Sequence, residues 1–180
     1  MSKTTNIKAT LMLLTLSTFT TEATARGLRV IGDSLQVMIP AYALGLAVKE
    51  DTDEGVSELW QSVLTTQLAT EVLKKATKQK RPDYEEGDKK DSFPSGHSAG
   101  AFSGATFIHK RYGLKQAVIP YTLATVVAYS RVDAKRHHPR DVIAGAGLAG
   151  LSTWIFVDSE NKLSLTSTGD ETRLQYKTKF

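Results

Sequence analysis

Ionisable side chains are concentrated in the twelve residues 130–141, which lie between two apolar segments. This stretch holds two adjacent histidines, two aspartates and several arginine and lysine residues. His137 and Asp141 are four positions apart, a spacing at which a carboxylate can orient an imidazole. Arg131 precedes them at the end of an apolar segment. A simple connection between helices rarely needs such a density of charge, so the stretch predicts a site for chemistry.

Two further clusters lie upstream. Lys74 and Arg81 are seven residues apart, which places them on one helix face if the helix continues almost to Pro82. The segment 94–97, Pro-Ser-Gly-His, is typical of a turn that opens a helix, and the free amides at a helix start can receive an anion. Both clusters can therefore contribute to an anion site.

Together the three clusters predict a phosphate site. Lys74, Arg81 and Arg131 can neutralise the non-bridging oxygens, and backbone amides near Ser95 and Gly96 can add an oxyanion cradle. Two histidines can divide the work, because one can attack phosphorus while the other protonates the leaving oxygen. Phosphoryl transfer depends mainly on positioning and charge stabilisation, so such a site requires no metal or other cofactor.

Other interpretations of these residues have less support. Asp133, His137, His138 and Asp141 could instead bind a metal ion, but the neighbouring cations would repel it. The segment 145–150 matches G-x-G-x-x-G, yet it lies inside an expected helix with no preceding strand, which argues against dinucleotide binding. Its small residues are more typical of close helix–helix contact.

The segments that must position these residues are helical by their length and their flanking breakers. Trp60, Leu64, Leu68 and Val72 recur at every fourth position, which predicts an amphipathic helix that ends before Arg81. The polar face of that helix argues against full exposure to lipid. Four more helices are expected within 34–48, 98–111, 116–130 and 142–157.

The N-terminus has the pattern of an export signal. Lys3 and Lys8 precede an apolar run over 9–19, and an A-x-A site follows at 23–25. The run is too short to span a bilayer, so a cleaved signal peptide is expected. An uncleaved anchor or an amphipathic start is the alternative. We predict export to the periplasmic side.

Composition sets wider limits. A chain of 180 residues suits one domain with a real core, and the absence of cysteine excludes disulfides and thiolate metal sites. A net charge of +4 is too small to indicate a nucleic-acid partner, although it suits an anionic substrate or a membrane surface. The uncharged segments fall short of the ~18–20 residues of a spanning helix, so both a soluble and a membrane-associated protein remain open. Oligomeric state is not predicted.

The three clusters resemble a known signature. Lys74-x6-Arg81-Pro82, the Pro-Ser-Gly-His segment 94–97, and Ser130-Arg131-x5-His137-x3-Asp141 are similar in order and spacing to the type-2 phosphatidic acid phosphatase superfamily. This superfamily includes lipid phosphate phosphatases, undecaprenyl-diphosphate phosphatases, bacterial nonspecific acid phosphatases and vanadium haloperoxidases. The resemblance spans residues 74–141.

The resemblance implies roles for individual residues. His137 matches the nucleophile that forms a phosphohistidine, Asp141 the carboxylate that holds its other nitrogen, and His97 the general acid. The residues that match the phosphate binders are Lys74, Arg81, Ser95, Gly96 and Arg131. The family hydrolyses its substrates without a metal, so no cofactor is expected.

The sequence thus predicts an all-α protein: a signal peptide over 1–25, a bundle of about five helices over 26–160, and a polar tail over 161–180 that forms a small hairpin or is disordered. We expect a metal-independent phosphatase acting on phosphomonoesters or diphosphates, with lipid substrates such as phosphatidic acid or undecaprenyl diphosphate preferred. The alternatives are a soluble nonspecific acid phosphatase and, with less support, a vanadate-dependent haloperoxidase.

Overall fold

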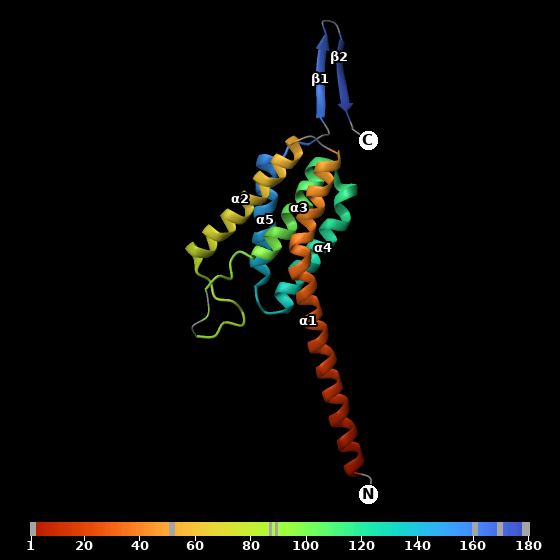
Figure 1. The fold of residues 1–180 in the computed structure, drawn as a ribbon, viewed down its shortest axis with the longest axis vertical. Coiled ribbons are helices and arrows are strands. Elements are labelled where there is room, and N and C mark those ends of the chain that lie inside the picture. Colours follow the sequence, from red (N-terminus) through yellow and green to blue (C-terminus); the bar gives the residue numbers. More distant parts are fainter. Residues whose placement is uncertain are drawn as a thin grey trace.

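The protein is an all-α bundle with a small hairpin at its C-terminal end (Figure 1). The computed structural model describes residues 3–50, 53–86, 88, 90–159, 162–168 and 171–177, and the side chains of those within 26–159. In this part of the chain the elements are α1 (Lys3–Glu50), α2 (Asp53–Thr77), α3 (Gly96–Tyr112), α4 (Leu114–Asp133), α5 (Pro139–Phe156), β1 (Lys162–Thr168) and β2 (Glu171–Lys177). The predicted class and the five helices are confirmed, and the tail forms the antiparallel hairpin.

Helix α3 is the centre of the bundle, because it packs against each of the other four helices. Its sequence is rich in alanine, glycine and serine, and most of its residues are buried. Small side chains allow neighbouring backbones to approach closely. Gly104 shows this for α1, since a Cβ atom there would lie 2.7 Å from the backbone nitrogen of Pro40.

Gly145 allows a second close approach. A Cβ atom at this position of α5 would lie 2.5 Å from the carbonyl oxygen of Ser95 and 3.0 Å from the amide of Ala99. The backbone of α5 is therefore held against the turn that opens α3. This confirms the close contact predicted from the small residues of 145–150, although Gly150 itself has no atom within 4 Å of the equivalent position.

Helix α1 is longer than predicted. It continues through Pro40 and begins at Lys3, so it includes the segment interpreted as a signal peptide. The helix does not test cleavage, and the side chains of 3–25 lie outside those described. Within the described residues, 26–50 is the one helical stretch whose length and apolarity would suffice to cross a membrane, a property that core helices and signal sequences share.

Helix α2 is oriented differently from what its pattern suggested. Trp60, Leu64, Leu68 and Val72 point outward and are between 51% and 67% exposed, so the apolar face of this helix is not the one that packs into the bundle. The face that packs into the bundle is instead polar and small, with Ser62, Thr66 and Thr70 fully buried. Ser62 and Thr66 donate their hydroxyl protons to carbonyl oxygens of their own helix, which allows these polar groups to be buried.

Helix α2 begins at Asp53 and carries Asp53 and Glu54 in its first turn. Acidic side chains there favour helix initiation because they complement the positive end of the helix dipole.

We predict opposite effects for two glycine substitutions in α5. Gly145→Ala would force its Cβ atom against the backbone of α3 and should lower the free energy of unfolding by about 1–3 kcal/mol. Gly150→Ala is the matched control: it meets open space, so it should leave stability unchanged or raise it by up to about 1 kcal/mol through helix propensity. Thermal unfolding of the purified variants measures both. Equal melting temperatures would contradict the close packing inferred at Gly145.

Candidate active site

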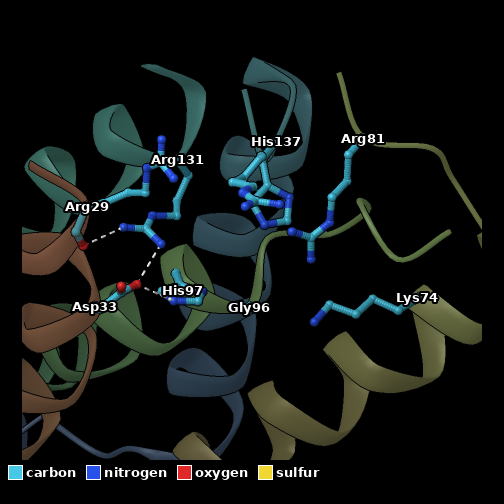
Figure 2. A pocket seen from close by; sticks show the side chains of 9 residues that line it. Arg29, Asp33, Lys74, Arg81, Gly96, His97, Arg131 and His137 are labelled. Atoms are coloured by element: carbon cyan, nitrogen blue, oxygen red, sulfur yellow. Dashed lines mark hydrogen bonds and ion pairs between the residues drawn. The ribbon is translucent and has the colours of Figure 1, made fainter. Parts of the chain in front are cut away.

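A cavity of about 260 Å³ lies at the end of the bundle where α2 and α4 finish and α3 and α5 begin (Figure 2). All three sequence clusters meet there. The lining residues are Arg29, Asp33, Lys74, Arg81, Gly96, His97, Arg131, Arg136 and His137. Most of them are cationic, so the cavity suits an anion.

The first cluster reaches the cavity from two different elements. Helix α2 ends at Thr77, so Lys74 is helical while Arg81 lies in the following loop. The prediction that both share one helix face was therefore wrong, although both side chains line the cavity. Lys74 Nζ lies 3.0 Å from Glu71 Oε1, and Arg81 Nε donates to Asp91 Oδ1 at 2.9 Å. Each cation is thus held by its own carboxylate.

The second cluster forms the start of α3. Ser95 caps this helix, because its Oγ accepts a hydrogen bond from the amide of Ser98 at 3.4 Å. The amide of Ser95 donates to the carbonyl oxygen of Asp141 at 2.9 Å, so it is not free for an anion. The predicted cradle is therefore reduced to the amides of Gly96 and His97, which as first-turn groups have no acceptor within the helix.

Gly96 also has a steric role. A Cβ atom at this position would lie 3.2 Å from Lys74 Nζ, so a larger residue would press on that ammonium group. Ser95 is fully buried and does not line the cavity, unlike Gly96. The structure therefore places Ser95 behind the site, where it organises the turn.

His137 is buried in the loop before α5, and its ring is oriented by a group that sequence reasoning missed. Its Nδ1 lies 2.7 Å from the carbonyl oxygen of Ser92. A carbonyl oxygen only accepts, so Nδ1 carries the proton and Nε2 is left with a free lone pair. A backbone carbonyl has no signature in the sequence, because any residue supplies one.

Asp141 is fully buried, and it forms hydrogen bonds with Ser92 and His138 and not with the imidazole of His137. Its Oδ2 accepts from the hydroxyl of Ser92 at 2.6 Å and from the amide of His138 at 2.9 Å. The same oxygen lies 3.8 Å from His137 Nδ1, which is too long for the direct bond expected from the i, i+4 spacing. Asp141 therefore fixes the residue whose carbonyl holds the imidazole.

Burial lowers the pKa of His137 to about 4. The cation at Arg81 acts in the same direction, while the Ser92 carbonyl and the Asp141 carboxylate oppose it less strongly. Removing an imidazolium from water is costly, so the buried ring stays neutral at ordinary pH. A neutral imidazole with a free nitrogen has the electronic state of a nucleophile.

Arg131 and His97 are connected by a carboxylate from α1 (Figure 2). Asp33 Oδ1 accepts from Arg131 NH1 at 2.7 Å and lies 3.0 Å from His97 Nε2. Arg131 NH2 donates to the carbonyl oxygen of Arg29 at 2.9 Å. Sequence reasoning missed Arg29 and Asp33, because they lie about forty residues before the first cluster and share no spacing with it.

Two other polar residues of the stretch 130–141, Arg136 and His138, differ in their relation to the cavity. Arg136 lines the cavity and lies 3.4 Å from Asp83, although it was not among the predicted phosphate binders. His138 is the N-cap residue of α5 and does not line the cavity. Among the described residues, no group of three or more His, Asp or Glu is arranged to hold a metal ion.

The burial of His137 predicts how its protonation depends on pH. Its ring should remain neutral until the pH falls to about 4, instead of protonating near its ordinary value of 6.5. Because the unfolded chain binds this proton more readily, stability should fall as the pH is lowered from 6.5 towards 4. NMR titration of histidine-labelled protein, with the resonance assigned by its loss in His137→Ala, measures the pKa. A value near 6.5 would contradict the buried, neutral ring.

Comparisons with known proteins agree with this geometry. A family model described as the PAP2 superfamily matches residues 56–164, which is more than half of the chain. A lipid A 1-phosphatase of Porphyromonas gingivalis is 30% identical over 157 residues, covering 77% of this chain and 34% of that protein. A lipid A 4'-phosphatase of Helicobacter pylori is 41% identical over 63 residues, covering 35% of this chain and 32% of that protein. The chain spans only about a third of the length of these two relatives.

Two solved structures share the fold. The transmembrane PAP2-type phosphatidylglycerolphosphate phosphatase from Bacillus subtilis superposes with a TM-score of 0.53 at 26% identity, over 74% of this chain and 73% of that one. Aquifex aeolicus LpxE has the same TM-score at 24% identity, over 73% and 93% of the two chains, which shows the fold alone. With the three sequence clusters gathered around one cationic cavity and a family match over most of the bundle, this chain belongs to the PAP2 superfamily.

Proposed function

We propose that this chain is a metal-independent phosphatase that hydrolyses phosphomonoesters or diphosphates of lipids through a phosphohistidine intermediate. The observation that carries the proposal is the state of His137: a buried, neutral imidazole whose Nδ1 is occupied by Ser92 and whose ring lines a cationic cavity. Nε2 is then the atom that can reach phosphorus. Lys74, Arg81 and Arg131 line the same cavity, which supports a role for them in binding the phosphate oxygens.

In the first step, Nε2 of His137 attacks phosphorus while the bond from phosphorus to the leaving oxygen breaks. His97 gives a proton to that oxygen, so the alcohol or phosphate leaves in neutralised form. The ring becomes cationic when its second nitrogen is phosphorylated. The Ser92 carbonyl and the nearby Asp141 carboxylate both favour that positive charge, so they stabilise the intermediate more than the resting state.

In the second step, water attacks the phosphohistidine. His97, now neutral, accepts a proton from the water as the bond from phosphorus to His137 breaks. Inorganic phosphate leaves, His137 returns to its neutral form, and His97 is protonated again. Charge on the phosphoryl oxygens is held throughout by the cations of the cavity, which need no reorganisation during the reaction.

The exterior of the bundle supports a lipid substrate. Large apolar side chains are exposed on the four helices that surround α3, including Ile31 and Met38 of α1, Leu68 of α2, Ile119 of α4 and Trp154 of α5. Exposed apolar surface of this extent is unusual for a soluble monomer and marks contact with a membrane or a partner. Helices with small polar residues inside and large apolar residues outside are typical of membrane proteins. This favours the lipid phosphatase over the soluble acid phosphatase.

The relatives support the same substrate class. Two are named for phosphatase activity on lipid A, and one solved neighbour for activity on phosphatidylglycerol phosphate. We infer that the cavity opens on the periplasmic side of the membrane. The end of the bundle that carries the cationic cavity residues would then meet the lipid headgroups. A phosphate on a lipid could then enter the cavity while its chains stay in the bilayer.

Phosphate release from detergent-solubilised protein tests this proposal. The panel compares phosphatidic acid, an isoprenyl diphosphate and lipid A with soluble monoesters such as p-nitrophenyl phosphate. We expect turnover of at least one lipid phosphate, which His137→Ala should reduce by about 10³-fold or more because the covalent route is lost. His109→Ala is the matched control, because His109 lies near the opposite end of α3, where it contacts Tyr121.

Two outcomes would contradict the proposal. Turnover by His137→Ala close to that of His109→Ala would exclude His137 as the nucleophile. Efficient release from soluble monoesters with none from lipid phosphates would favour the soluble acid phosphatase.

A further inference from the structure

Asp33, which belongs to none of the three sequence clusters, also lines the cavity. Asp33 lies on α1, before the region that the family model matches. It is the only acidic residue among those described that line the cavity. Its Oδ1 contacts Arg131 NH1 at 2.7 Å and His97 Nε2 at 3.0 Å, so one oxygen connects two of the residues placed in the reaction (Figure 2).

We propose that Asp33 is a positioning residue for this site: it fixes the guanidinium of Arg131, orients the ring of His97 through Nε2, and favours the protonated form of His97 that a general acid requires. The inference rests on the phosphatase activity proposed above, and it adds α1 to the elements that the site needs. It is carried by the two contacts of Asp33 and by the burial of Arg131.

Arg131 shows what the carboxylate does for phosphate binding. Arg131 is only 4% exposed, and such a buried charge needs a close partner of opposite sign. Nε donates to Ser130 Oγ at 3.1 Å, NH1 donates to Asp33, and NH2 donates to the carbonyl oxygen of Arg29. A guanidinium has five N–H groups, so one on each terminal nitrogen remains for a substrate. Asp33 therefore fixes the direction of these two donors.

The close approach of α1 makes these contacts possible. A Cβ atom at Gly32 would lie 2.3 Å from Ser130 Oγ and 2.6 Å from Arg131 NH2. With glycine there, the α1 backbone comes near enough for the carbonyl oxygen of Arg29 and the carboxylate of Asp33 to reach the same guanidinium. The contact is thus built into the packing of α1 against α4.

Asp33 also determines which ring nitrogen of His97 carries a hydrogen. A carboxylate oxygen only accepts, so the Nε2 that contacts Asp33 must carry a hydrogen. Nδ1 is then the nitrogen available for transferring a proton to the leaving oxygen. Burial lowers the pKa of His97, and the cations Arg131 from α4 and Lys74 from α2 lower it further. His137 from the loop is the other titratable group that acts on it. Asp33 is the nearby group that favours the protonated ring.

Two other roles for Asp33 make different predictions. If its charge merely repelled the substrate, neutralising it would lower KM and leave kcat unchanged. If it only stabilised the fold, neutralising it would lower the melting temperature without moving the pH profile. A positioning residue affects kcat and the basic limb of the pH–rate profile, where a general acid loses its proton.

The test compares Asp33→Asn, Asp33→Glu and the wild type with a lipid phosphate that the wild type hydrolyses. We expect Asp33→Asn to reduce kcat on the order of 10- to 100-fold and to move the basic limb of the profile to lower pH. Asp33→Glu keeps the charge, so it should restore the basic limb and part of kcat. Asp133→Asn is the matched control, because Asp133 is exposed at the end of α4 and does not line the cavity.

An Asp33→Asn variant with the kcat and pH profile of Asp133→Asn would overturn the proposal, and so would a fall in KM alone. Melting temperatures establish that each variant is folded. If Asp33→Asn does not fold, the wild type itself provides the test: in ¹⁵N-histidine spectra at neutral pH, Nε2 of His97, assigned by its loss in His97→Ala, must be protonated. An unprotonated Nε2 there would overturn the role of Asp33. Lack of turnover by the wild type would instead count against the phosphatase proposal.

Discussion

Mutual repulsion among the cations of one cavity is the constraint on which the rest of the structure depends. Like charges that line so small a space oppose folding unless nearby carboxylates balance them. Four of the cations each have such a partner: Lys74 with Glu71, Arg81 with Asp91, Arg131 with Asp33, and Arg136 with Asp83. Three of these carboxylates do not line the cavity, so the site stays positive toward a substrate while the local charge is compensated. Only Asp33 faces inward.

Close packing of the helices makes this charge arrangement possible. The cations come from different elements, so they meet only if α1, α2, α4 and α5 all approach α3 closely. Glycines supply that proximity at Gly104, Gly145 and Gly32, each of which faces the backbone or side chain of a neighbouring helix. The small residues that form the interior leave the large apolar residues for the outside. One packing rule thus accounts both for the assembly of the site and for the apolar exterior that favours a membrane.

The helices and most of the cavity residues could be predicted from the sequence, because the patterns that indicate them lie within short segments of the chain. Helix breakers and apolar runs were enough to predict the number of helices, and the motif residues Lys74, Arg81, Gly96, His97 and Arg131 all line the cavity. The remaining features depend on contacts between distant segments. The Ser92 carbonyl is a backbone group, and Asp33 is 64 residues from His97. The outward face of α2 depends on which of its sides packs against α3 and α5. A pattern of period four shows that a helix has two faces, but not which of them is buried.

The central claim is that His137 becomes covalently phosphorylated, and intermediate trapping tests it most directly. Purified protein is mixed with a ³²P-labelled lipid phosphate, quenched in alkali within milliseconds to seconds, and digested for mass spectrometry. The structure predicts an acid-labile, alkali-stable phosphoryl group on the peptide that contains His137, attached at Nε2 because Nδ1 is held by Ser92. Phosphate release at full rate with no label on that peptide, or with label on His97 instead, would contradict the account.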